Sequence, residues 1–166
     1  MHINLKALAA AVALVCSAAA QAEGAYVGGV FGVMKTDVSG VSGDSPLNAG
    51  IRAGYTWNSG WGVEAELTDS LVEGEFDSYW GDENYSFATM ALYATYRSQG
   101  DIYFKGRLGY LREELYVDYF GEYSDSGTSA GIGAGFKLTE KVTFEAEYTI
   151  IEADVDYWSG SLVVRF

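Results

Sequence analysis

Residues 47–58 read LNAGIRAGYTWN, and they alternate strictly between two kinds of side chain. Leu, Ala, Ile, Tyr and Trp occupy the odd positions, whereas Asn, Gly, Arg and Thr occupy the even positions. A period of two places successive side chains on opposite faces of a β-strand. The stretch is therefore predicted to be a strand with one apolar face and one face of small or polar residues.

The same strand signal recurs along the rest of the chain. It is found in segments 61–72, 85–97, 102–111, 127–138, 141–151 and 157–166. Segment 25–35 is also strand-like, but both of its faces are apolar or Gly, so its faces are not assigned. Each of these eight segments has roughly ten residues, which is the length that a tilted strand needs to cross a bilayer.

The connections between these segments alternate in length. Those near 58–60, 97–101 and 139–140 are short, whereas those near 36–46, 73–84, 112–126 and 152–156 are longer. Outer-membrane barrels combine short periplasmic turns with longer external loops. The pattern predicts an all-β fold: an eight-stranded antiparallel transmembrane up-and-down β-barrel, with both termini on the periplasmic side.

A secreted soluble barrel, such as a lipocalin-like fold, is the alternative, and it would turn its apolar face inward. However, the polar face here is mostly Gly, Ser, Thr and Tyr, whereas a face in water would be dense in charged residues. The outward aromatic residues also fall at two heights, with Trp57 and Trp61 near the short turns and Tyr110 and Trp158 near the long loops. Two aromatic belts around an apolar band favour the membrane.

The few charged residues on the polar face have opposite signs at similar heights. Counted from the short turns, Arg52 lies about opposite Glu66, and Arg107 lies at a height similar to Glu147. Unpaired charges in a low-dielectric interior cost several kcal/mol, so these groups must be paired. The expected luminal ion-pair network consists of Arg52, Glu64, Glu66, Lys105, Arg107, Glu145 and Glu147.

The N-terminal segment reads as a targeting signal. Lys6 precedes an apolar run, and Ala20-Gln21-Ala22 fits a signal-peptidase site, so residues 1–22 are predicted to be a cleaved signal peptide and 23–166 the barrel domain. His2 and Cys16, the chain's one His and one Cys, would leave with the signal. The barrel would then lack a His general base, which argues against an enzyme, and no cofactor or metal site is expected.

The C-terminal stretch YWSGSLVVRF (157–166) resembles that of the OmpA/OmpX-type small outer-membrane β-barrel proteins, also called porin-like. The stretch 131–151, with Glu147-Tyr148, resembles the family's penultimate hairpin. The resemblance implies a Gram-negative outer membrane and an assembly signal that the barrel-insertion machinery recognises. That signal would comprise Trp158, Leu162, Val164 and Phe166 on one face of the last strand.

The resemblance also implies a role in envelope structure, adhesion or resistance at the cell surface. The formal charge is −13, and 15 of the 23 acidic residues lie in the predicted outer loops, which excludes nucleic acid as a partner. Expected partners are outer-membrane lipid and lipopolysaccharide, with host or neighbouring surface proteins contacting the loops. There, aromatic residues offer anchors: Tyr79, Trp80, Tyr119, Phe120 and Tyr123. The alternative function is a small-conductance porin-like channel, although eight strands leave an interior filled by side chains.

Overall fold

The computed structural model describes residues 24–36, 43–72, 74–78, 81–117, 121–152 and 155–166. Within this part of the chain all regular structure is β: β1 (Ala25–Thr36), β2 (Gly43–Asp44), β3 (Leu47–Thr56), β4 (Trp61–Val72), β5 (Gly74–Ser78), β6 (Gly81–Arg97), β7 (Ile102–Val117), β8 (Gly121–Lys137), β9 (Val142–Glu152) and β10 (Val155–Arg165). No helix among these residues is long and apolar enough to cross a membrane.

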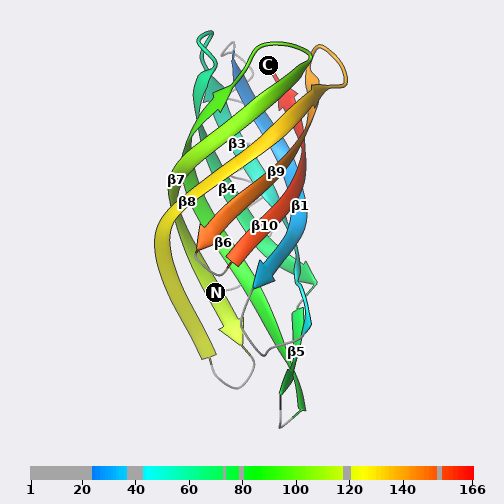
Figure 1. Ribbon diagram of the computed structural model, residues 1–166, viewed down its shortest axis with the longest axis vertical. Helices are drawn as coiled ribbons and strands as arrows, with labels where there is room; N and C mark the ends of the chain where they lie inside the picture. Colours follow the sequence, from blue (N-terminus) through cyan, green and yellow to red (C-terminus); the bar gives the residue numbers. More distant parts are fainter. Residues whose placement is uncertain (1–23, 37–42, 73, 79–80, 118–120, 153–154) are drawn as a thin grey trace.

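Eight of these strands close into a barrel (Figure 1). Each pairs antiparallel with its chain neighbour, β6 pairs with β7, and β1 joins the last strand, β10, from Tyr26↔Arg165 to Thr36↔Val155. The short β2 and β5 lie outside this ring, where β2 pairs with β5 and β5 pairs with the start of β6. The prediction of an eight-stranded antiparallel up-and-down barrel is confirmed.

The structure differs from the prediction in how far three strands extend. Much of 73–84 and 112–126 was expected to be loop, yet β6 begins at Gly81, β7 continues to Val117 and β8 begins at Gly121. A strand alternates between apolar and polar residues where one of its faces contacts lipid. Where a strand continues beyond the lipid, neither face has to be apolar, and the alternation disappears. The backbone pairing nevertheless continues, so composition alone mistakes these extensions for loops.

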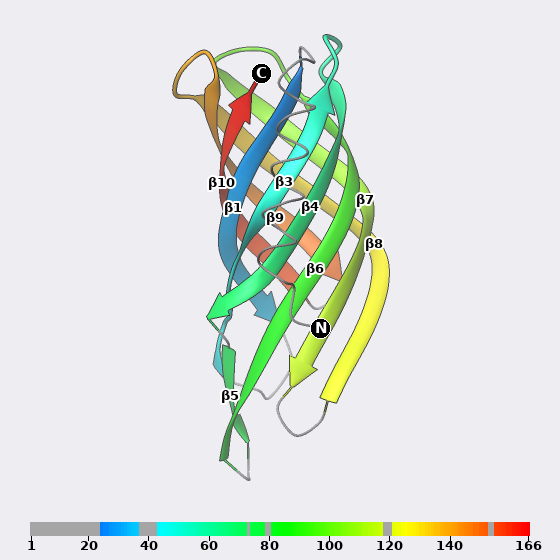
Figure 2. The same cartoon turned by 180° about the vertical axis from the view of Figure 1, so that it is seen from behind.

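The predicted short connections are tight turns at one end of the barrel. Two of them use glycine at a positive φ, with Gly60 at 87° and Gly100 at 125°, a region that residues with a Cβ adopt only with strain. In the third, the Thr139 hydroxyl accepts a hydrogen bond from the Val142 amide (2.9 Å). Figure 2 shows the C-terminus at the same end as these turns, with the β5–β6 hairpin at the opposite end.

The outer surface of the barrel is apolar. Leu92, Leu108 and Ile132 are each about 60% exposed, which suits contact with lipid rather than water. Aromatic residues pair on this surface, with ring centroids 5.3 Å apart for Trp61–Tyr96 and 4.8 Å apart for Tyr148–Trp158. The interior therefore holds the polar face, as the sequence predicts.

The interior has two parts of different chemistry. Toward the short turns lies a group that we call the charged cluster: Arg52, Glu64, Glu66, Arg97, Lys105, Arg107, Glu145 and Glu147. Toward the other end lies the apolar cluster: Val30, Met34, Ala91, Tyr93, Leu111, Ile151, Val155 and Tyr157. The inward residues of β1, whose faces the sequence left open, supply Val30 and Met34 to the apolar cluster.

Candidate functional site

The charged cluster is the most concentrated polar feature of the described interior. β3, β4, β7 and β9 bring together all seven residues expected in the network, and β3 pairs with β4 so that Arg52 lies directly opposite Glu66. Each of the seven is at most 4% exposed. Side chains alternate between the two faces of a strand, and all seven residues lie on inward faces at similar heights, so their side chains meet in the lumen.

Lys105 lies among three carboxylates. Its Nζ is 2.9 Å from an oxygen of Glu64, 2.9 Å from one of Glu145 and 3.1 Å from one of Glu147. An ammonium has three donors and no acceptor, so this arrangement uses its full capacity. Lys105 therefore links β4 to β9 across the lumen.

Arg52 connects the same two walls from β3. Its Nη2 is 2.5 Å from Glu66 Oε2, and its Nη1 donates to Glu147 and, at 3.2 Å, to Glu145. Within the described residues its Nε has no hydrogen-bond partner. Arg52 thus lies at ion-pair distance from both glutamates of β9 and both glutamates of β4, although Glu64 is the most distant, at 3.9 Å.

Arg107 completes the end of the cluster nearest the apolar residues. Its Nη1 donates to Glu66 Oε2 (2.9 Å), and its Nη2 donates to the Thr149 hydroxyl (2.6 Å). The guanidinium carbon lies 4.4 Å from the centroid of the Tyr93 ring, which gives a cation–π contact. Tyr93 belongs to the apolar cluster, so the two clusters meet here.

The structure adds Arg97, which the sequence reasoning did not include. Its Nε is 2.9 Å from Glu145 Oε1, and its Nη2 is 2.8 Å from Glu64 Oε2. It has the same parity as the inward-facing Thr95 and Tyr93, so the alternation could have revealed it. Its place as the last residue of its strand, beside a turn, hid that signal.

With Arg97 included, the cluster contains four basic and four acidic residues and is formally neutral. Each basic side chain lies at ion-pair distance from at least two carboxylates. Tyrosine hydroxyls add donors, from Tyr26 to Glu64 (2.8 Å) and from Tyr103 to Glu145 (2.5 Å). A buried charge needs such pairing and hydrogen bonding to offset its lost hydration.

Glycines on β8 make the room for these long side chains. A Cβ on Gly135 would collide with the Tyr103 ring, one on Gly133 would approach Glu147 Cγ to 2.6 Å, and one on Gly131 would approach Arg107 Nε to 3.0 Å. The alternating glycines of β8 are therefore the complement of the bulky residues on β7 and β9.

Three of the predicted assembly-signal residues share the outer face of β10, and the fourth, Phe166, directly follows that strand. Trp158 is 55% exposed, Leu162 49%, Val164 39% and Phe166 37%, and β10 is flanked by β1 and β9. The expected aromatic anchors Tyr79, Trp80, Tyr119 and Phe120 lie outside the described residues, as does the side chain of Tyr123. Among the described residues no group of three or more His, Cys, Asp or Glu residues is arranged to hold a metal ion.

Comparison with known families agrees with this architecture. Residues 7–166 match the family described as outer membrane protein beta-barrel domain. The chain belongs to this family. It is therefore an outer-membrane β-barrel, and its location is the bacterial outer membrane. No curated protein matches the chain.

Solved structures share the fold. Neisserial surface protein A (NspA) has 16% identity and a TM-score of 0.58, with 87% of this chain and 98% of that chain covered. The outer membrane protein OprG of Pseudomonas aeruginosa has 13% identity and a TM-score of 0.58, covering 87% and 97%. Ail, the attachment invasion locus protein of Yersinia pestis, solved with the heparin analogue sucrose octasulfate, has 18% identity and a TM-score of 0.53, covering 84% and 93%.

Proposed function

We propose that this protein anchors a binding element at the bacterial cell surface and performs no catalysis. The observation that carries the proposal is the sheet of β6, β7 and β8, which continues beyond the rest of the barrel (Figure 1). β7 pairs with β8 as far as Val117 and Gly121, whereas β8 pairs with β9 only as far as Ala130 and Ile150. Within the described residues, 121–129 thus has a strand partner on one side only.

A free sheet edge presents unpaired backbone groups to which an extended peptide can add as a further strand. Residues 121–129 read GEYSDSGTS, with two acidic side chains and no basic one. The acidic residues disfavour pairing between two copies and favour a partner that carries Lys or Arg. A basic extended segment of a host or neighbouring surface protein is therefore the partner that fits this edge.

In the proposed orientation the protruding sheet faces outward and both termini lie in the periplasm. The asymmetry of the connections supports it, because barrels of this kind place short turns on the periplasmic side. Residues 1–22 would serve as the signal peptide that directs export.

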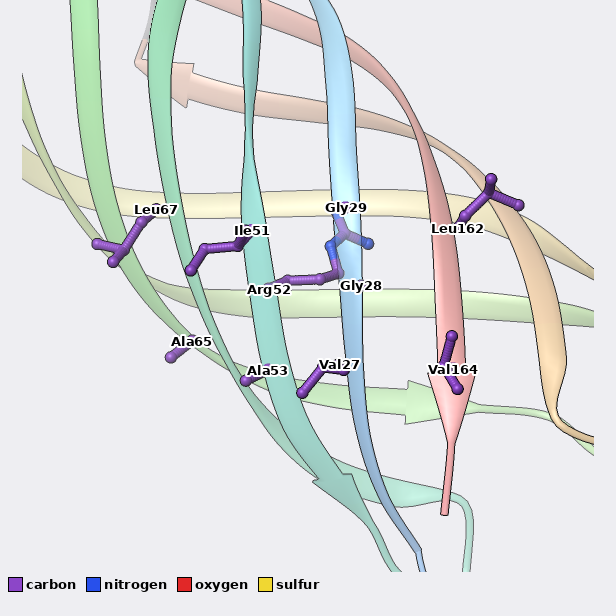
Figure 3. Close-up of a pocket in the computed structure, with 10 residues that line it drawn as sticks. All are labelled: Val27, Gly28, Gly29, Ile51, Arg52, Ala53, Ala65, Leu67, Leu162 and Val164. Atoms are coloured by element: carbon purple, nitrogen blue, oxygen red, sulfur yellow. The ribbon is translucent and has the colours of Figure 1, made fainter. Parts of the chain in front are cut away.

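The lipid partners are proposed from the outer surface. A hollow of about 400 Å³ lies over β1, β3, β4 and β10. Figure 3 shows residues that line it, among them Val27, Ile51 and Leu162. Its apolar lining suits acyl chains.

The surface role is tested by replacing 114–124, the end of the β7–β8 hairpin, with a two-residue Asn-Gly turn. The shortened barrel should still migrate differently on SDS gels with and without boiling, because the membrane-spanning strands are untouched. Cells that carry it should lose adhesion or become sensitive to serum, compared with cells carrying the full chain. Unchanged adhesion and unchanged serum and detergent sensitivity would reject the role of the protruding sheet.

The outer face of β10 is proposed to act as the signal that the insertion machinery reads. Phe166→Ala should lower the amount of barrel in the outer membrane of cells, while refolding of the purified variant in detergent stays efficient. An equal loss in both measurements would mean that Phe166 stabilises the barrel and signals nothing.

A small-conductance channel is the second candidate. The inward position of the charged residues favours it, because rearranged ion pairs could admit small ions. Against it, all eight residues of the charged cluster are mutually paired, and the apolar cluster fills the lumen beyond them. Planar-bilayer recordings distinguish the two candidates. The surface role predicts no channel current across the bilayer, whereas sustained open-channel currents would favour the channel.

A further inference from the structure

The mouth of the barrel at the short-turn end contains a hollow of about 210 Å³. Its walls come from the turns after β3 and β6 and from the ends of β7, β8 and β10. Three of its eleven lining residues are basic, namely Arg97, Lys137 and Arg165, and none is acidic. Arg97 is already paired with Glu64 and Glu145, so the other two cations decide what the hollow can bind.

Arg165 differs from every basic residue of the charged cluster. Each of those lies at ion-pair distance from at least two carboxylates, whereas Arg165 has no carboxylate at that distance among the residues that the structure places. Its Nε is shielded from solvent and has no hydrogen-bond partner there. A buried donor without a partner costs about 1–3 kcal/mol, so the Arg165 guanidinium is not fully satisfied by the groups around it.

Arg165 is also held in place by aromatic residues. Its guanidinium carbon lies 5.8 Å from the Tyr103 ring centroid and 5.9 Å from that of Tyr26, and its Nη2 donates to the Tyr103 hydroxyl (3.4 Å). That hydroxyl donates in turn to Glu145, which is already paired with Lys105 and Arg97. The guanidinium is thus oriented by the cluster without being neutralised by it.

The second cation of the hollow is only weakly neutralised. Lys137 Nζ lies 3.5 Å from Asp101 Oδ1, but the Asp101 side chain is 92% exposed and that of Lys137 is 42% exposed. A pair in such contact with water contributes little, and Lys137 can turn toward another acceptor. The amide of Gln99 on the rim offers a further neutral donor.

We propose that this hollow binds an oxyanion, a carboxylate or a phosphate group, with the Arg165 guanidinium as the principal donor. A guanidinium presents parallel N–H groups that match the two oxygens of such a group. Lys137 and Gln99 close the rim around it. The site is separate from the sheet edge of the proposed function, and its volume limits it to one small group, either a free ion or the end of a peptide.

The test titrates the folded barrel in zwitterionic micelles, at constant ionic strength, while amide NMR shifts are followed. The probes are inorganic phosphate and a tripeptide with a free or an amidated C-terminus. Saturable shifts around Gly100, Tyr103 and Arg165 are expected. Phosphate binding without a preference between the peptides assigns a free ion, and a preference for the free carboxylate assigns a peptide end.

Arg165→Gln should weaken binding about tenfold, as expected when a charge-assisted pair is lost. The matched control, Lys141→Gln, removes the same charge from an exposed position at the same end outside the hollow and should leave binding unchanged. Gln99→Glu, in a turn where folding is not at risk, should also weaken binding, because it places a carboxylate beside Arg165. No saturable shift with either probe, or equal weakening by Lys141→Gln and Arg165→Gln, would overturn the proposal.

Discussion

The charged cluster and the apolar cluster fill the same lumen by different means. In the first, five strands contribute full charges that pair with one another, and the Lys105 ammonium lies within 3.1 Å of three carboxylates. In the second, Val30, Leu111 and Ile151 are at most 2% exposed and are held by packing. Loss of one side chain should therefore destabilise the barrel more in the charged half, because it leaves buried charges without a counter-charge.

We expect the largest effect on stability from removal of the Lys105 ammonium at the centre of the charged cluster. Lys105→Met keeps most of the side-chain volume but leaves Glu64, Glu145 and Glu147 with one cation fewer. The free energy of unfolding should fall by about 3–5 kcal/mol, the cost of an uncompensated buried charge. Urea unfolding in lipid vesicles measures it.

Lys141→Met is the matched control, because Lys141 is exposed at the barrel end and forms no ion pair that the described structure shows. Its effect should be close to zero. Equal destabilisation by the two substitutions would mean that the luminal pairing contributes nothing specific.

The apolar half is tested by a cavity. Leu111→Ala should cost about 2–5 kcal/mol, because the packed lumen cannot fully collapse around the lost atoms. Leu108→Ala, on the same strand but 59% exposed on the outer surface, should cost less, since lipid fills the space. The same urea titration compares the two. If Leu108→Ala proves the more damaging, the lumen beyond the charged cluster is not tightly packed.

We expect a smaller loss of stability when a glycine that packs against a bulky side chain is replaced. Gly135→Ala pushes a methyl group into the Tyr103 ring and should cost about 1–3 kcal/mol. Gly29→Ala is the control, because a Cβ there meets nothing within 4 Å. Thermal unfolding of the two variants should separate them, and identical midpoints would contradict the close approach of β8 to Tyr103.

The sequence predicted the barrel and the charged half for the same physical reason. A strand that faces lipid on one side must alternate, and a charge on its other face stands out, as Arg52 and Glu66 do. The apolar half lacks that contrast. When the inward residue is Val30 or Met34, both faces of β1 look alike, and the alternation carries no information about direction.

The extensions of β6, β7 and β8 could not be predicted from the sequence for a second reason. Beyond the lipid no face must be apolar, so 112–126 has the composition of a loop although most of it is paired. Arg97 was missed because it ends its strand, and Arg165 because a single sequence does not show which cations lack a partner. These features depend on register, which only the assembled barrel fixes.

The most direct measurement is a double-mutant cycle on Arg52 and Glu66, whose side chains approach to 2.5 Å. Coupled burial predicts that Arg52→Ala and Glu66→Ala are each more damaging than the neutral pair replacement, and that the coupling free energy is about 1 kcal/mol or more. If the two substitutions are additive within about 0.5 kcal/mol, the luminal charges are not a coupled network.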